Sequence, residues 1–409
     1  MSDEPTAGTP PTESGGSGDR SLFKDLTGVG VDWRSAVLVP ALALLSAMLV
    51  GIVIIAVTDI DALRLWFEDP GAAFSETRQT VWGAYHSLLV GSVGSVRAIS
   101  ETLTQASPLI LAGLSVAVGF RAGLFNIGAS GQMLVGGMMA TYVGITFDFP
   151  APIHLPLAIL AGAVGGALWG FIPGLLRART GAHEVITTIM LNLIALRLVE
   201  YFLKTTLFQA EGRPDPVSSD VHPSAQMPEL LGFLNRVDLR VHLGIVIAVL
   251  AAYGVYWLLF KSTIGFEYRA LGLNPHGARY AGMNVTWLYV SVMAVAGALA
   301  GLAGADRILG VLTRATPGFA GAVGFDAIAL ALVGRSHPAG VVAAGLLFGG
   351  LRAGGQVMQV RTDISLDLIL VIQALVVVFI AAPALIRAIY RVRTGEAATE
   401  QLKMGWGSA

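Results

Sequence analysis

The sequence has no cysteine and few charged residues. Of its 409 residues only 13% are Asp, Glu, Lys or Arg, whereas 54% are hydrophobic. The absence of cysteine excludes disulfides, thiolate catalysis and cysteine-ligated metals. A soluble domain carries about 25% charged residues, and the formal net charge of -1 argues against a nucleic-acid partner. The composition therefore predicts a membrane protein.

The hydrophobic residues form runs of about 17–25 residues, which is the length that crosses a bilayer. We therefore predict an all-α fold, a polytopic bundle of about ten transmembrane helices. The predicted spans are 36–57, 103–119, 126–145, 153–176, 185–203, 241–260, 285–304, 325–334, 339–350 and 366–386. The eighth and ninth are short and can form a broken hairpin. Segment 81–95 is apolar but interrupted by glycine, which predicts a short interfacial or re-entrant piece.

The two ends of the chain differ from the middle in composition. Residues 1–30 are rich in Ser, Gly, Thr, Pro and acids, and they lack the features of a secretory signal. We expect a disordered cytoplasmic tail at 1–30, a transmembrane domain at 31–393 and a cytoplasmic C-terminal tail at 394–409.

Basic residues orient the chain in the plasma (inner) membrane. The positive-inside rule places the side with most of them in the cytoplasm, together with both termini. These residues are Arg34, Arg121, Arg177, Arg179, Lys261, Arg269, Arg279, Arg335, Arg387, Arg391 and Arg393. The longer loops around 59–80 and 206–240 then face outward.

Glycine is abundant, with 50 residues, and often recurs at a spacing of four. This spacing places the glycines of one helix on one face, where a second helix can approach closely. We predict such faces at Gly162, Gly166 and Gly170, at Gly297 and Gly301, and at Gly345 and Gly349.

Polar residues interrupt the apolar runs at three informative places. Segment 120–132 contains several glycines together with Asn126 and Gln132, and such a segment must face protein or a water-filled path. Asn192 lies inside the fifth span, and Asp326 begins the eighth. We predict that Asn126, Gln132, Asn192 and Asp326 line a solute path. Helix packing for Gln132 and a helix-start role for Asp326 are the structural alternatives.

The sequence lacks the motifs of several kinds of chemistry. There is no P-loop and no His-Glu-x-x-His metalloprotease motif, so we expect neither ATP binding by that device nor a metal site. Ser130 lies in a short motif like that of rhomboid-type intramembrane proteases, but no histidine lies in the middle of a later span to act as its base. That protease is a remote alternative. An ion-coupled secondary transporter is a second, with Glu184 or Asp326 as the coupling carboxylate.

The loop 261–284 contains a predicted short helix. Asn274 and Pro275 form a helix start, residues 276–281 extend for about two turns, and Gly282 is suited to the C-terminal cap. We expect this helix to be a docking element exposed to the cytoplasm.

Segment 120–132 also resembles the signature FRAGLFNIGAEGQ of the permeases of ATP-binding-cassette importers for nucleosides and simple sugars. Ser130 departs from it, because the family usually has glutamate there. Five further segments resemble the family in the same order along the chain: 101–108, 184–192, 268–275, 278–282 and 329–335.

The resemblance implies a type II importer fold and a transport subunit that is not an enzyme and needs no cofactor. The implied partners are a second permease, cytoplasmic ATPases, an extracytoplasmic lipoprotein that binds the substrate, and membrane lipid. The bundle would form the path for nucleosides or simple sugars, and the ATPases would drive alternating access. The predicted helix then becomes the coupling helix, with Asn274, Pro275, Ala278, Arg279, Tyr280, Ala281 and Gly282 contacting an ATPase.

Overall fold

The structure, a computed structural model, describes residues 33–58, 60–234, 236, 238–362, 364, 366–381 and 390. The predicted tails at 1–30 and 394–409 lie outside these ranges. Within them the regular structure is helical, with two isolated β-bridges in the loop before α9 and no strand. The helices are α2 (Trp33–Thr58), α3 (Ile60–Glu68), α4 (Pro70–Val93), α5 (Val96–Arg121), α6 (Ala129–Thr146), α7 (Ala151–Thr180), α8 (Glu184–Phe202), η1 (Pro223–Ala225), η2 (Gly232–Leu234), α9 (Gly244–Lys261), α10 (Thr263–Leu273), α11 (Pro275–Tyr280), α12 (Val285–Asp306), η3 (Arg307–Leu312), α13 (Val323–Val333), α14 (Pro338–Thr362) and α15 (Leu366–Ala381). The predicted all-α class is confirmed.

Seven of the described helices are long and apolar enough to cross a membrane: α2, α5, α7, α8, α9, α12 with η3, and α14. Helices α13 and α15 are apolar but shorter. The predicted ninth span, 339–350, is too short, because α14 continues without a break to Thr362. Of the two spans that were predicted to be short, the eighth and the ninth, only the eighth is short, and it corresponds to α13.

The prediction of a short piece at 81–95 is wrong, because these residues belong mostly to the 24-residue α4. Asp69 caps the start of this helix by accepting hydrogen bonds from the backbone of Gly71 and Ala72. A Cβ atom on Gly91 would lie 2.9 Å from Cα of Gly354 in α14. The glycine therefore allows close packing between α4 and α14 and does not interrupt the helix.

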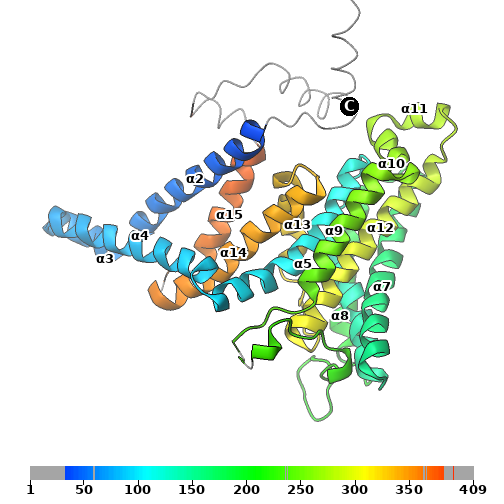
Figure 1. Cartoon of the computed structure of the whole chain (residues 1–409), viewed down its shortest axis with the longest axis horizontal. Helices are drawn as coiled ribbons and strands as arrows, with labels where there is room; N and C mark the ends of the chain where they lie inside the picture. The colour runs from blue at the N-terminus through cyan, green and yellow to red at the C-terminus, as the bar shows by residue number, and fades with distance from the viewer. Residues whose placement is uncertain are drawn as a thin grey trace, which may run out of the picture.

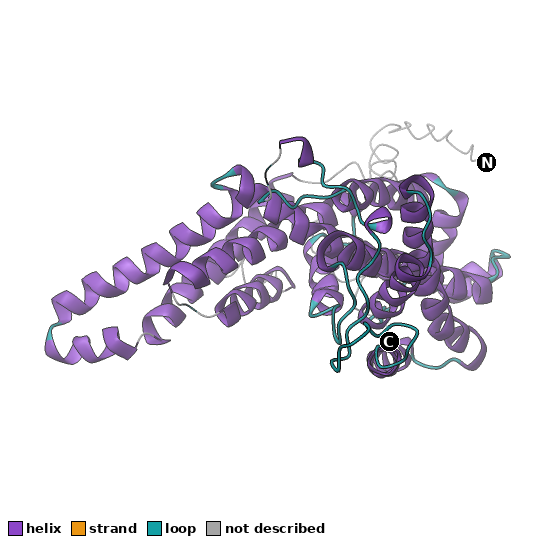
Figure 2. Ribbon diagram, turned by 90° about the horizontal axis from the view of Figure 1, so that it is seen from below, coloured by secondary structure: helices purple, strands orange, loops and turns teal. Residues whose placement is uncertain are grey.

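The helices form a large bundle with a smaller lobe beside it (Figure 1). Helices α2, α3, α4 and α15 make the lobe, which projects from the bundle in the second view as well (Figure 2). Helices α10 and α11 lie at one end of the bundle, and the irregular loop containing η1 and η2 lies at the other (Figure 1). The two ends of the bundle thus differ in structure.

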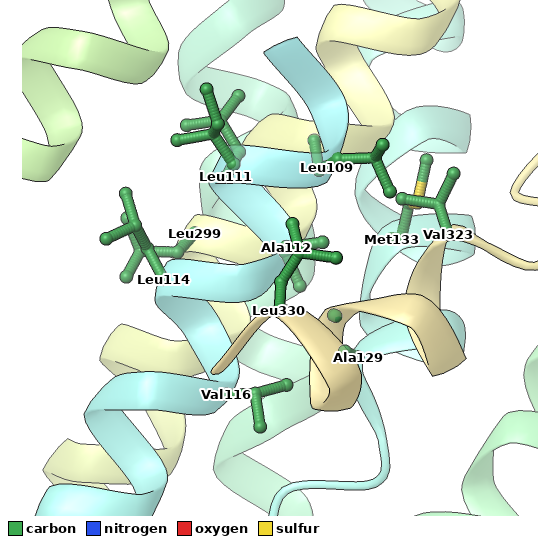
Figure 3. Packing of buried hydrophobic residues seen from close by; sticks show 14 of the residues in the cluster. Leu109, Leu111, Ala112, Leu114, Val116, Ala129, Met133, Leu299, Val323 and Leu330 are labelled. Carbon is green, nitrogen blue, oxygen red and sulfur yellow. The ribbon is translucent and has the colours of Figure 1, made fainter. Parts of the chain in front are cut away.

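Helix α5 is the central element of the bundle and is buried along most of its length. Its neighbours include α9, α12, α13 and α14. Figure 3 shows its apolar side chains among residues of α6, α12 and α13, with Leu109, Leu111, Ala112, Leu114 and Val116 labelled on α5. The position of α5 is therefore fixed by several helices at once.

Helices α7 and α12 pack through the glycine faces predicted from the sequence. A Cβ atom on Gly166 would overlap with the carbonyl oxygen of Gly297, and one on Gly301 would overlap with that of Gly162. The two backbones therefore touch directly, as is typical of helices associated through small residues. This interface confirms the predicted close packing of both glycine sets.

Candidate functional site

The polar turn between α5 and α6 is held together by a pair of side-chain amides. Nδ2 of Asn126 donates to Oε1 of Gln132 at 2.9 Å, and Nε2 of Gln132 donates to Oδ1 of Asn126 at 3.1 Å. Oδ1 of Asn126 also accepts the backbone N–H of Gly128 at 3.1 Å, and Nδ2 lies 3.2 Å from the hydroxyl of Ser115. Both amides are almost fully buried.

Asn192 fixes the same turn from α8. Its Oδ1 accepts the backbone N–H of Gly131 at 2.8 Å, and its Nδ2 donates to the carbonyl of Ile127 at 2.9 Å. These bonds satisfy backbone groups that a non-helical segment leaves open in a membrane protein. The observed partners of Asn126, Gln132 and Asn192 are thus protein groups, and their contact with a solute stays a prediction.

Asp326 lies in the first turn of α13 and forms an ion pair with Arg352 of α14. The two side chains are 20% and 18% exposed. Sequence analysis singled out Asp326 but missed Arg352, because the predicted ninth span ended at residue 350. A basic residue two positions beyond a short apolar run was the available signal.

A second polar cluster lies where α5, α9 and α12 meet, and sequence analysis missed it. Oδ2 of Asp306 accepts a hydrogen bond from the hydroxyl of Ser107 at 2.9 Å, and both residues are buried. The buried ring of His242 lies next to Asp306. Burial, with a smaller effect from the positive charge of Arg240, lowers the pKa of His242 to about 4, so its ring is neutral at pH 7.

The short helix predicted in loop 261–284 is confirmed as α11. Oδ1 of Asn274 accepts the backbone N–H of Gly277 at 2.9 Å and caps the helix start. Gly282 follows the helix with φ of +84°, a conformation that glycine adopts without strain. Ala278 is buried against the fold, whereas Tyr280 is 94% exposed. The helix therefore turns one face outward at the end of the bundle.

A stacked cluster joins this segment to the rest of the bundle. The guanidinium carbons of Arg121 and Arg269 lie 5.4 and 5.5 Å from the centre of the Phe260 ring. Nε of Arg121 also donates to the carbonyl of Ser336 at 2.9 Å, in the turn between α13 and α14. Helices α5, α9 and α10 and the turn between α13 and α14 are thus connected through Phe260 and two arginines.

Among the residues that the structure describes, no group of three or more His, Cys, Asp or Glu side chains is placed to hold a metal ion.

Comparison with known proteins identifies the family. Residues 98–381 match the family described as branched-chain amino acid transport system / permease component. The chain is 43% identical to the guanosine ABC transporter permease protein NupP of Bacillus subtilis, over 75% of this chain and 88% of the relative. It is 37% identical to the nucleoside ABC transporter permease protein NupB of Lactococcus lactis, over 75% and 85%.

A third relative is the glucose ABC transporter permease protein TsgB13 of Haloferax volcanii, 36% identical over 83% of this chain and 86% of the relative. No solved structure matches. These matches favour neither the secondary transporter nor the intramembrane protease. With a match over most of its length, this multi-pass membrane protein belongs to the family of branched-chain amino acid transport system permease components.

Proposed function

We propose that this chain is the transmembrane permease subunit of an ATP-binding-cassette importer and forms the path for nucleosides, with simple sugars as the second class of solute. The relatives named for guanosine and nucleosides support the first class, and the relative named for glucose supports the second. The observation that carries the proposal is the outward-facing α11 on a family permease. The chain performs no covalent chemistry, because ATP hydrolysis takes place on its partners.

Helix α11 is the proposed contact with the cytoplasmic ATPase. Ala278 anchors the helix, and the other residues are exposed for docking: Asn274, Pro275, Arg279, Tyr280, Ala281 and Gly282. This docking places α11 and both termini in the cytoplasm, and it places the η1–η2 loop outside, where a lipoprotein delivers the solute. A second permease completes the membrane part of the importer.

The stacked cluster gives a route for motion from the ATPase to the path. Closure of the ATPases would move α11 and α10 together, since they are consecutive helices. Arg269 of α10 stacks on Phe260, on which Arg121 also stacks, and Arg121 holds the turn between α13 and α14. Rigid movements of packed helices are a common way of switching between two openings.

The proposed solute path passes the turn after α5 and the start of α13. Asp326 lies beside the path with Arg352. Asn126, Gln132 and Asn192 shape its wall by fixing the turn between α5 and α6. A neutral solute with hydroxyl groups needs such hydrogen-bonding groups and small residues, and it needs no fixed net charge.

Replacement of Gly282 by Glu tests the docking assignment. Gly212 supplies the matched control, because both glycines have positive φ and no atom within 4 Å of an added Cβ, while Gly212 lies in the loop at the opposite end. We expect Gly282→Glu to abolish ATP-dependent uptake of radiolabelled guanosine and to reduce co-purification of the ATPase. Gly212→Glu should retain ATPase co-purification.

Undiminished co-purification with Gly282→Glu would refute the docking assignment. Guanosine or ribose uptake that persists after removal of the ATPases would refute ATP-driven transport. Comparing uptake of the two solutes by the wild-type importer decides between the two classes of solute.

A further inference from the structure

The ion pair between Asp326 and Arg352 lies near the middle of the membrane domain. Helix α13 ends at Val333, and the turn after it is bound by Arg121 at the α10–α11 end of the bundle. With a rise of 1.5 Å per residue, Asp326 lies about 10 Å farther in. Arg352 lies about 15 Å along α14 from the opposite helix end at Thr362.

This ion pair is open to its surroundings. The side chains of Asp326 and Arg352 are 20% and 18% exposed. A charged side chain at the centre of a bilayer costs roughly 3 kcal/mol on insertion scales, and such residues nearly always face protein or water. The exposed side of the pair therefore faces a water-filled path or the second permease.

The backbone beside the pair leads to the same conclusion. Residues 316–322 precede α13 and form no regular helix, and four of them are exposed: Pro317, Gly318, Gly321 and Ala322. The ring of Phe319 in this segment packs on Gly137, halfway along the 18-residue α6. Irregular backbone at membrane depth does not contact lipid, because lipid cannot satisfy its polar groups.

A further charged group lies near the pair. Arg307 of η3 is repelled by the like charges of Arg352 and Arg240, and it is attracted by Asp306 and by Glu101, the ion-pair partner of Arg240. Nε of Arg307 is buried and has no hydrogen-bond partner among the described residues. An N–H donor of Arg307 is thus buried without such a partner.

We infer that Asp326 and Arg352 form a solute-binding pair inside the translocation path, an inference that rests on the proposed transport function. The carboxylate accepts hydrogen bonds and the guanidinium donates them. The carboxylate and the guanidinium together fit a neutral solute that has a hydrogen-bond donor next to a hydrogen-bond acceptor. In the absence of solute the two side chains satisfy each other, and an arriving solute replaces their mutual contact with one contact to each.

Two parts of a nucleoside have this chemistry. The lactam edge of guanine presents an N–H beside a C=O, and the ribose presents two neighbouring hydroxyl groups. Purine riboside has the ribose hydroxyls but no N–H donor on its base, whereas 2′,3′-dideoxyguanosine has the lactam edge without the hydroxyls. Uptake of the three nucleosides therefore distinguishes the two sources.

The test compares Asp326→Asn and Arg352→Lys with the wild-type importer, assembled with its ATPases and binding protein. Each variant's uptake is divided by wild-type uptake of the same solute, so the preferences of the binding protein cancel. Glu200→Gln is the matched control, because Glu200 forms an ion pair with Arg197 on α8. Arg352→Lys keeps the positive charge but loses the planar fork of donors.

If the pair binds the lactam edge, guanosine and dideoxyguanosine uptake should fall about tenfold or more, the factor expected for a hydrogen bond to a charged group, while purine riboside uptake changes little. If it binds the ribose, guanosine and purine riboside uptake should fall while dideoxyguanosine uptake is retained. Equal losses for all three solutes, or no loss, would overturn the inference. Wild-type uptake of neither guanosine nor ribose would instead overturn the proposed transport function.

Discussion

Nδ1 of His242 lies 3.7 Å from Oδ1 of Asp306, and both side chains are only 1% exposed. The same Nδ1 accepts the backbone N–H of Gly244 at 3.1 Å, so it presents a lone pair and the ring proton is on Nε2. Nε2 is buried and has no hydrogen-bond partner among the described residues. The fold therefore holds this histidine in its neutral form.

A loss of stability in acid follows from this arrangement. Burial lowers the pKa of His242 in the folded protein to about 4 from an ordinary value of 6.5. Between these values the unfolded chain binds a proton that the folded chain does not, so stability falls as the pH decreases from about 6.5 toward 4. The neutral ring therefore contributes stability at pH 7 that is lost toward pH 5, and a comparison of melting temperatures with a variant that lacks the ring measures this contribution.

The His242→Gln variant isolates this effect, because glutamine does not titrate in that range. Its melting temperature should change less between pH 7 and pH 5 than that of the wild-type protein. His183→Gln is the control, because His183 lies at the α7–α8 connection and is exposed. Identical pH profiles for the wild-type protein and His242→Gln would contradict the assignment.

The glycine interface between α7 and α12 makes a second prediction. A Cβ on Gly166 would overlap with backbone atoms of Gly297 and Gly301, which cannot move aside as a flexible side chain could. Gly166→Ala should therefore destabilise the protein by about 1–3 kcal/mol, as overpacking does, and lower its melting temperature. Gly254→Ala in α9 is the control, because an added Cβ there meets no atom within 4 Å. Equal effects of the two substitutions would refute the proposed role of close packing.

The sequence allowed this interface to be predicted because a spacing of four places residues on one helix face. It also located most spans and the short helix α11, since apolar runs and capping residues are local features. The turn containing Asn126 was not predicted, because Asn126 was placed in a helix that begins only at Ala129. The Asp306 cluster could not be found in this way. Its partner Ser107 lies 199 residues away in the chain, and His242 reaches it only through packing of α9 against α5.

The glycines at 83, 91 and 94 were misleading for a related reason. In isolation a glycine weakens a helix, which favours a broken segment at 81–95. In the fold Gly91 lies against Gly354, and Ser92 donates a 2.6 Å hydrogen bond to the carbonyl of Gly350. These contacts with α14 stabilise α4, and no local pattern in α4 encodes them.

A substitution of Asn192 can separate a structural role of its side-chain amide from a role in solute binding. Asn192→Ala would leave the N–H of Gly131 and the carbonyl of Ile127 without these hydrogen bonds. Leaving buried polar groups unpaired costs about 1–3 kcal/mol each, so the melting temperature should fall. Leu193→Ala, at an exposed position of the same helix, is the control and should change it little. A solute-specific loss of uptake at an unchanged melting temperature would show instead that Asn192 acts on the solute.

Arg121 should be required for coupling between ATP hydrolysis and uptake. Its guanidinium stacks on Phe260 and donates to the carbonyl of Ser336, which no neutral side chain of similar length reproduces. Residues 335 and 336 both have positive φ, near +50°, so their turn is strained and depends on its contacts. We expect Arg121→Gln to reduce guanosine uptake about tenfold or more while ATP hydrolysis continues, which a parallel measurement of both rates would detect. Arg121→Lys should restore part of the uptake through its charge. Arg179→Gln is the control, because Arg179 is exposed near the end of α7, and it should leave the ratio of uptake to hydrolysis unchanged. If Arg121→Gln also left this ratio unchanged, Arg121 would be excluded from the route between α10 and α13.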